Sequence, residues 1–224
     1  MALLSFGNDS KTVKGEAKGV MTGILYLLPE DTLCPRARNA GCREACLVTA
    51  GRGRMTNVKA GRQRKTDLYY ADPAAFVDML AKEIALAKKR AQKKGMELAI
   101  RLNGTSDIPC EHVSGKDGKS ILEIHSDVQF YDYTKLPTRK VPANYHLTVS
   151  YSGANDAYAA KCQDSKHNIA VVFRDKAAIP MVFAGRAVVD GDKTDLRFTD
   201  PAGVVVALYA KGAAKKDTTG FVIG

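Results

Sequence analysis

The chain has 224 residues, with 34 Lys and Arg against 24 Asp and Glu, and 45% of its residues are hydrophobic. This length and composition are ordinary for a globular α/β protein that buries its core without disulfides or metal ions as supports. The formal net charge of +10 favours anionic partners.

No stretch of the sequence approaches the roughly 20 apolar residues that span a bilayer. The first residues also lack the basic lead and long apolar run of a secretory signal. We therefore expect a cytoplasmic protein with no membrane partner. Thiols usually stay reduced in that compartment, so the five cysteines, an odd number, indicate metal binding or catalysis rather than a disulfide framework.

The first predicted strand covers residues 21–28, MTGILYLL, whose continuous apolar run is typical of a buried parallel strand. A turn-rich stretch follows and leads into CPRARNAGCREAC, residues 34–46, which holds three of the cysteines. Residues 42–51, CREACLVTAG, are expected to form a short helix that ends at Gly51.

The most strongly predicted helix begins after Asp72, which can cap it, with Pro73 in its first turn. Its core face has three- and four-residue spacing, and consists of Phe76, Leu80, Ile84, Ala87 and Ala91. Lysines and arginines cover the other faces and the last turn, where the helix dipole favours cations, and Gly95 ends the helix.

Shorter apolar runs, separated by polar loops, fill the rest of the sequence at residues 96–102, 128–135, 145–152, 168–174, 181–192 and 203–212. Residues 153–163 are expected to be helical. Strands that alternate with helices predict an α/β fold with mainly parallel strands, in the form of a partial or full (β/α) barrel. We find no linker or internal repeat, so residues 1–224 are predicted to form a single domain.

Polar residues follow the predicted strands: Asn103, Ser106, Asp107, Asp132, Tyr133, Lys135, Ser150, Ser152, Asn155, Asp190, Asp192 and Asp195. The carboxyl ends of parallel strands share one edge of a sheet, where α/β enzymes hold their ligands. The candidate catalytic residues are Asp107, Glu111, Asp132 and Lys135, and Asp107 and Glu111 can serve as general acid and base. The alternative is that these loops are polar only because they face water.

Cys34, Cys42 and Cys46 have the spacing C-x7-C-x3-C. Three thiolates from one loop can bind three irons of a four-iron, four-sulfur cluster, or zinc with a fourth ligand from elsewhere. The nearby arginines are expected to lower the pKa values of these thiols. Cys110 is a possible fourth ligand and His112 a weaker one, whereas Cys162 is expected in a helix core. The alternative is three buried cysteines without a metal.

Much of the excess positive charge is local, because residues 36–65 contain nine Lys or Arg and one acidic residue, Glu44. Such a concentration beside a candidate site favours a phosphate-bearing partner, nucleic acid or nucleotide. The candidate phosphate-binding residues are Arg52, Arg54, Arg62, Arg64 and Lys65. A solvated basic surface without a ligand is the alternative.

Asp190, Asp192 and Asp195 lie close together in the segment DGDKTD, which suits a hard cation such as Mg²⁺. A polar turn without a ligand explains the same pattern. The four histidines are scattered along the chain and form no recognisable metal or catalytic pair.

The cysteine segment after an apolar first strand, followed by AGRGRMTNVKAGRQRKTDLYY, RLNGTSDIP, VQFYDYTK and VVDGDKTDLRFTDP, resembles an uncharacterised family of bacteriophage proteins. That family is similar to the radical-SAM-like iron–sulfur barrels, and the match covers most of the chain. The resemblance implies a cluster loop after the first strand and, for a phage-encoded chain, the host cytoplasm. The usual radical-SAM motif is C-x3-C-x2-C; Cys42 and Cys46 match its first pair, but Thr49 stands at the third position.

Three functions compete. The first is an enzyme with a four-iron cluster on Cys34, Cys42 and Cys46 that acts on nucleic acid or a nucleotide, with SAM as a possible cosubstrate. The second is a DNA- or RNA-binding module in which zinc or a cluster is structural. The third is a Mg²⁺-dependent nuclease that uses the aspartates. The pattern leaves the substrate and the oligomeric state open.

Overall fold

The computed structural model of the protein describes residues 1–7 and 10–224. Its strands are β1 (Leu4–Phe6), β2 (Val20–Leu25), β3 (Glu97–Arg101), β4 (Gln129–Thr134), β5 (Tyr145–Ser150), β6 (Asn168–Phe173), β7 (Val182–Phe183), β8 (Arg186–Asp190), β9 (Val205–Tyr209) and β10 (Val222–Ile223). Its α-helices are α1 (Ser10–Glu16), α2 (Thr56–Ala71), α3 (Pro73–Lys93), α4 (Ile121–Ile124) and α5 (Asp156–Gln163). Its 3-10 helices are η1 (Leu47–Thr49), η2 (Gly51–Arg54), η3 (Cys110–His112), η4 (Arg197–Thr199) and η5 (Gly212–Lys216).

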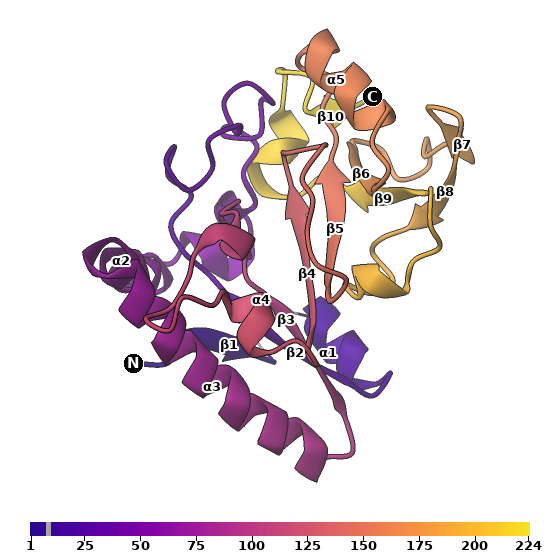
Figure 1. The fold of residues 1–224 in the computed structure, drawn as a ribbon. Coiled ribbons are helices and arrows are strands. Elements are labelled where there is room, and N and C mark those ends of the chain that lie inside the picture. The colour runs from indigo at the N-terminus through magenta and orange to yellow at the C-terminus, as the bar shows by residue number, and fades with distance from the viewer. Residues whose placement is uncertain (8–9) are drawn as a thin grey trace.

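The described strands form one sheet in the order β1-β2-β3-β4-β5-β6-β9-β8-β7 (Figure 1). From β2 to β8 all neighbours are parallel, whereas the edge strands β1 and β7 are antiparallel to theirs. β10 pairs with the last two residues of β6, past the point where its neighbour β5 ends. The prediction of an α/β fold with mainly parallel strands is therefore confirmed.

The sheet is not closed into a barrel, so the prediction of a full barrel is wrong. Closure requires the two edges of a sheet to pair with each other, and in the described chain β1 and β7 each have a single neighbour. Both edges are instead extended by antiparallel strands that the sequence analysis did not anticipate. The neighbouring strands β2, β3, β4, β5, β6 and β9 are nevertheless parallel, which brings their carboxyl ends to one edge.

Helix α3 covers one face of the sheet and agrees with its sequence prediction. The side chain of Asp72 accepts a hydrogen bond from Ala75 N at 2.9 Å, and Pro73 occupies the first turn. All five residues of the predicted apolar face are buried, and they pack with Met21, Ile100 and Phe130 of the sheet. Gly95 follows the helix with φ +64°, a conformation that glycine adopts without strain.

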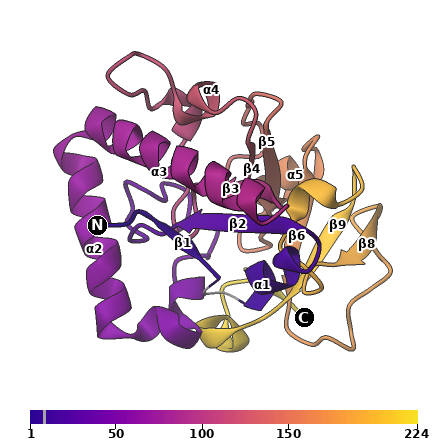
Figure 2. The same ribbon diagram turned by 90° about the horizontal axis from the view of Figure 1, so that it is seen from below.

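The other face of the same strands is covered by shorter elements. Viewed from below, α1 and α3 lie on opposite sides of β2 (Figure 2). Phe198 of η4 and Leu196, which precedes η4, pack against Tyr131 of β4 and Ala99 of β3. The sheet is thus covered on both faces, as parallel sheets usually are.

Three local predictions differ from the structure. Residues 42–51 do not form one helix that ends at Gly51; they form turns followed by the short 3-10 helix η1, and η2 begins at Gly51. Residues 181–192 form a hairpin of β7 and β8 rather than one strand, because Ala184 and Gly185 take positive φ angles of 49° and 73° in a two-residue turn. Helix α2 was not predicted, and within it only Thr66 is buried.

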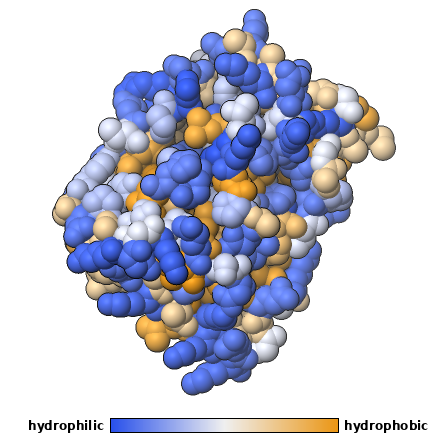
Figure 3. Space-filling model, in the orientation of Figure 1, coloured by the Kyte–Doolittle hydropathy of each residue, from blue (hydrophilic) through white to orange (hydrophobic). Residues whose placement is uncertain are grey.

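Hydrophilic side chains cover most of the face seen in Figure 3, with hydrophobic atoms showing between them. Among the described helices, none is long and apolar enough to cross a membrane.

Candidate functional site

The carboxyl ends of β3, β4 and β5 lie at one edge of the sheet, as predicted. The parallel register pairs Ile100 of β3 with Phe130 of β4, and Thr134 at the end of β4 with Val149 near the end of β5. Six of the twelve predicted polar residues are buried here: Asn103, Ser106, Asp107, Asp132, Lys135 and Ser152. Sequence order alone was therefore sufficient to predict this edge.

The cysteine loop, which we define as residues 31–46, lies against this edge and is built of successive turns. Cys34 N donates to Glu30 O at 2.7 Å, and Cys42 N donates to Ala37 O at 2.9 Å. Asp107 N donates to Leu33 O at 2.7 Å, which ties the loop to the connection between β3 and β4. The loop is thus held by backbone hydrogen bonds rather than by a regular element.

The three thiols of the loop are half-buried and unoxidised. Cys34 Sγ donates a long hydrogen bond of 3.7 Å to Thr105 O. Burial raises the pKa of Cys34 to about 12, and nearby charge on Cys46 and Cys42 adds to this rise. Burial also raises the pKa of Cys46. The thiols therefore lie close enough to interact electrostatically.

The arginines around the loop act on the thiol pKa values in the expected direction, but the net pKa of Cys34 and of Cys46 is raised. Arg43 opposes the rise at both thiols, and Arg62 opposes it at Cys46, but burial is the larger effect. Arg62 itself is half-buried, with its guanidinium 5.4 Å from the centre of the Tyr26 ring. The charges are present where predicted, but desolvation outweighs them.

The C-terminal segment, residues 210–223, packs over the far end of the cysteine loop. Cys42 and Ala45 belong to one apolar cluster with Phe221 and Val222. Thr219 Oγ1 lies 3.4 Å from Gly41 O, and a Cβ on Gly41 would come within 2.3 Å of that hydroxyl. Close packing therefore requires glycine at position 41, and the cysteine loop is held between two distant parts of the chain.

Cys110 occupies a different environment from the other candidate ligands. It lines a small apolar cavity beneath α3, together with Phe76 and Leu80. Burial raises its pKa to about 12, and its polar neighbours include Asn103 Nδ2, at 3.8 Å from Sγ. The described contacts of Cys110 do not include the cysteine loop, and His112 beside it is exposed. Among the described residues no contact links Cys110 or His112 to the three thiols, so their role as a fourth ligand stays a prediction.

Asp107 and Glu111, the candidate acid and base, both pair with Arg139. Arg139 Nε and Nη2 donate to the two Glu111 carboxylate oxygens at 2.7 and 2.5 Å, and Nη1 lies 3.4 Å from Asp107 Oδ1. Asp107 Oδ2 also accepts from Lys135 N at 2.7 Å. These bonds connect the loops after β3 and β4, so the two carboxylates hold the edge of the sheet together.

Asp132 is fully buried and binds the end of the neighbouring strand. Its carboxylate accepts hydrogen bonds from Leu102 N at 2.9 Å, Asn103 N at 3.0 Å and Tyr145 Oη at 2.9 Å. Arg101 Nε lies 3.7 Å away. Burial raises the pKa of Asp132 to about 6, against the opposing effects of Arg101 and the hydrogen bonds. Asp132 is therefore held in place as a structural group of the edge.

Lys135 is buried, with 6% of its surface exposed, and its ammonium lies at the same edge. Nζ donates to Ser150 O at 2.9 Å and lies 4.4 Å from the centre of the Phe221 ring. Burial lowers the pKa of Lys135, and charge on Cys42, Cys162 or Asp107 opposes this shift. The other three candidate catalytic residues, Asp107, Glu111 and Asp132, form ion pairs with arginines. Among the described residues, Lys135 forms no ion pair.

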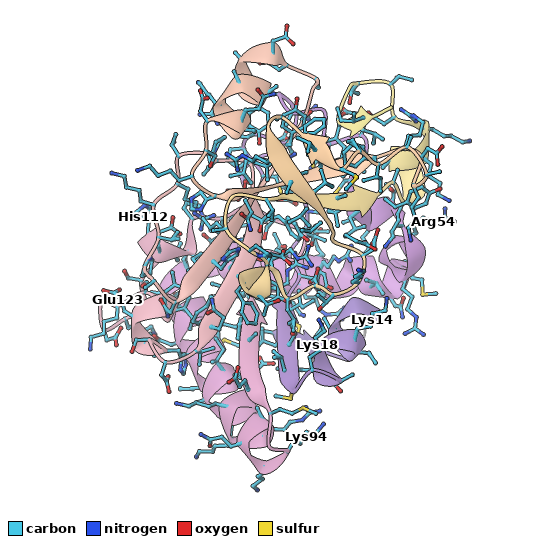
Figure 4. The ribbon with its side chains drawn as sticks, turned by 90° about the vertical axis from the view of Figure 1, so that its right-hand side faces the viewer. Lys14, Lys18, Arg54, Lys94, His112 and Glu123 are labelled. Atoms are coloured by element: carbon cyan, nitrogen blue, oxygen red, sulfur yellow. The ribbon has the colours of Figure 1, made fainter. Side chains whose placement is uncertain are left out.

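The candidate phosphate-binding residues divide into two groups. Arg52, Arg54 and Arg64 are exposed on η2 and α2. Lys65 has a structural contact, because Nζ donates to Leu3 O at 2.6 Å. Figure 4 shows Arg54 at the right of the molecule with Lys14 and Lys18 of the α1 region below it, whereas His112 and Glu123 lie at the left. An exposed basic surface thus begins immediately after the cysteine loop.

The three aspartates of the possible magnesium site do not converge. Asp190 Oδ1 accepts from Asp192 N, and Asp192 Oδ1 lies 3.2 Å from Lys211 Nζ. Asp195 is buried and instead accepts from Arg101 Nη1 of β3 at 2.8 Å. Within the described residues no three His, Cys, Asp or Glu side chains surround a single ion position.

Arg101 and Arg139 are the important residues that sequence reasoning missed. Arg101 sits in the apolar run MELAIRL, where a lone charge is a signal for a buried ion pair. Arg139 stands in the polar stretch TRKVPA, and nothing in the sequence distinguishes it from an exposed loop residue. Both are paired with carboxylates that sequence reasoning had selected for catalysis or metal binding.

These features define a class: an α/β protein with an open, mostly parallel sheet and a three-cysteine loop at the carboxyl edge of that sheet. Within this class, the sequence model of the Gene product 88 family matches residues 2–224, so the chain belongs to that family, which is of phage type. No curated protein and no solved structure shows significant similarity to the chain.

Proposed function

We propose that the protein binds an iron–sulfur cluster on Cys34, Cys42 and Cys46 and acts on a nucleic acid or a nucleotide. The observation that carries this proposal is the gathering of three unoxidised thiols in one loop at the carboxyl edge of a parallel sheet. Ligands of α/β proteins bind at this edge, and the exposed basic residues of η2 and α2 continue from the same loop.

The donor set suits a cluster better than a single zinc ion. Zinc requires its ligands around one point at about 2.3 Å for each sulfur, an arrangement not found among the described residues. The thiolates of a four-iron cluster bind different irons and so lie further apart. Thiols that interact electrostatically without sharing one ion position fit this second arrangement.

We extend the proposal to a radical-SAM-like enzyme. The parallel strands β2, β3, β4, β5 and β6 follow one another in chain order, and the cysteine loop comes after the carboxyl end of the first of them. Cys34, Cys42 and Cys46 would hold three irons of a four-iron cluster, which would leave one iron free of protein ligands; the cluster would supply one-electron chemistry to a cosubstrate such as SAM. The position of Cys110 away from the loop supports this count of three.

Metal analysis of cysteine variants tests the proposal. Protein purified without oxygen is expected to contain iron and sulfide, and Cys34→Ser, Cys42→Ser and Cys46→Ser should each lose most of both. Cys162→Ala is the matched control, because this buried thiol packs in the core between α5 and the sheet, and Cys110→Ser should also retain its iron.

Three outcomes would change the conclusion. Iron loss in Cys110→Ser would make it a fourth ligand and remove the open iron position. Zinc without iron would favour a structural nucleic-acid-binding module. Full metal content in the Cys34 and Cys46 variants, or none in the wild type, would reject the cluster.

The basic surface has its own test. Binding of the wild type to a short DNA or RNA duplex should weaken steeply with salt, because each phosphate contact releases counterions. Reversal of Arg52, Arg54 and Arg64 to Glu should abolish it. The matched control reverses three exposed lysines at the end of α3, Lys89, Lys93 and Lys94, which makes the same change in net charge elsewhere. Equal loss in both variants would show that only the net charge matters.

A further inference from the structure

We propose that Lys135 is the counter-charge of the cluster: its buried ammonium stabilises the negative charge held by the cysteine loop and sets the reduction potential of the site. This inference rests on the proposed function, since it assigns a role to a residue beside the cluster. It makes Lys135 a positioning and tuning residue rather than a catalytic one.

The first argument is the burial of Lys135 without an ionic partner. An isolated ammonium is costly to remove from water, and buried lysines are normally paired. In the described part of the chain no ion pair reaches Lys135, because Asp107 and Glu111 pair with Arg139, and Asp132 lies beside Arg101. The nearby carboxylates are thus committed to arginines.

The second argument is the way the ammonium is held. Ser150 O accepts hydrogen bonds from both Lys135 Nζ and Tyr158 Oη, each at 2.9 Å. The rings of Phe221 and Tyr158 lie 4.4 and 5.9 Å from Nζ. A carbonyl oxygen and two aromatic rings fix the position of a cation, but they contribute no full negative charge to balance it.

The third argument is the position of the cysteine loop. Cys42 belongs to the same apolar cluster as Phe221, whose ring lies against Nζ. The ring of Phe221 thus joins the ammonium of Lys135 to the Cys42 end of the cysteine loop. A cluster with three thiolates is anionic, so the ammonium and the cluster would each compensate the charge of the other in a region of low dielectric constant.

This arrangement has a consequence that can be measured. Reduction of the cluster by one electron adds one negative charge and leaves the protein ligands unchanged. A fixed positive charge stabilises the reduced form more than the oxidised form, so Lys135 should raise the reduction potential.

The experiment is an anaerobic redox titration of the reconstituted protein with dithionite as the electron donor, followed by electron paramagnetic resonance. In Lys135→Met the ratio of reduced to oxidised cluster at a given potential should fall about tenfold or more, a shift of about 59 mV for one electron. Lys135→Gln, which keeps a donor for Ser150 O, should show the same shift. Lys135→Arg, which keeps the charge, should stay near the wild type.

The control is Lys161→Met, which removes an exposed lysine on α5 with the same change in net charge and should leave the potential unchanged. Circular dichroism establishes that each variant is folded, and Lys135→Gln serves where Lys135→Met does not fold. Folded, cluster-loaded Lys135→Met or Lys135→Gln with the wild-type potential would overturn the inference and leave the proposed function intact. A wild type that takes up no cluster would reject the proposed function itself.

Discussion

Two regions meet at the carboxyl edge of the sheet, and they treat their polar groups in opposite ways. The ionic region, made of Asp107, Glu111, Asp132, Arg101 and Arg139, satisfies its carboxylates with guanidinium groups, backbone amides and a tyrosine hydroxyl. The thiols of the cysteine loop differ. Among the described residues, the hydrogen bond that one of these thiols donates is the long bond from Cys34 Sγ to Thr105 O.

The two regions differ in how many partners their polar groups have, and this difference bears on how much each region stabilises the fold. Buried groups with a full set of partners stabilise the fold, and removing one partner exposes the cost of burying the other. Thiols with few and weak hydrogen bonds contribute less to the fold than the paired carboxylates do, so they can be reserved for a ligand. The carboxylates Asp107, Glu111 and Asp132 thus have a structural role through their partners, and both they and the cysteines stay candidates for chemistry.

The largest effect is expected from Arg139→Met. Loss of the guanidinium leaves Glu111 and Asp107 buried without their ionic partner, which should cost about 3–5 kcal/mol of unfolding free energy. Urea denaturation of the metal-free protein measures this. Lys140→Met, at the exposed neighbouring position, is the control and should change stability by less than about 0.5 kcal/mol. A mild effect of Arg139→Met would mean that the ionic region is not the framework.

An intermediate and pH-dependent effect is expected from Asp132→Asn. Because burial raises the pKa of Asp132 to about 6 in the fold, protonation favours the folded state. This contribution is complete below the unfolded pKa of about 3.9 and is lost as pH rises through about 6. The stability of the wild type relative to Asp132→Asn should therefore increase by about 2 kcal/mol between about pH 7 and pH 4. Denaturation at several pH values measures it, and a pH-independent difference would contradict it.

The smallest effect is expected from Cys34→Ala in the metal-free protein. The thiol is half-buried and makes one long hydrogen bond, so its loss should cost no more than about 1 kcal/mol. The same urea denaturation as for Arg139→Met measures it, with Cys162→Ala as a fully buried cysteine for comparison. If Cys34→Ala were as destabilising as Arg139→Met, the contrast between the two regions would fail.

The sequence predicted the elements in which several signals agree. Helix α3 has a cap at Asp72, a proline in its first turn, periodic apolar residues and a terminal glycine, and each signal was confirmed. Helix α2 has no such agreement, because its contact with the fold buries only Thr66 and leaves no apolar stripe to detect. The β7–β8 turn was not predicted because Ala184 adopts a left-handed backbone conformation, which glycine and asparagine adopt far more often than alanine.

The candidate site could be predicted only where its parts are local. Cys34, Cys42 and Cys46 share one loop, so their proximity followed from the sequence. The pairing of Arg139 with Glu111 spans 28 residues, and that of Arg101 with Asp195 spans 94. Such pairs depend on the paths of intervening loops, which the hydrophobic pattern does not specify. The positions of Cys110 beneath α3 and Lys135 beside Phe221 were unpredictable for the same reason.

The packing of the C-terminal segment against the cysteine loop affects the order of folding during synthesis. The contacts of Thr49 with Ala213 and of Gly41 with Thr219 span 164 and 178 residues. At a synthesis rate of about 5–20 residues per second, the residues that cover the thiols are made roughly ten to thirty seconds after the thiols themselves. Thiol labelling of ribosome-bound chains stalled before Gly212 would detect this interval as fast modification of Cys42. Translation itself thus provides a delay during which the cysteine loop is not yet covered by the C-terminal segment.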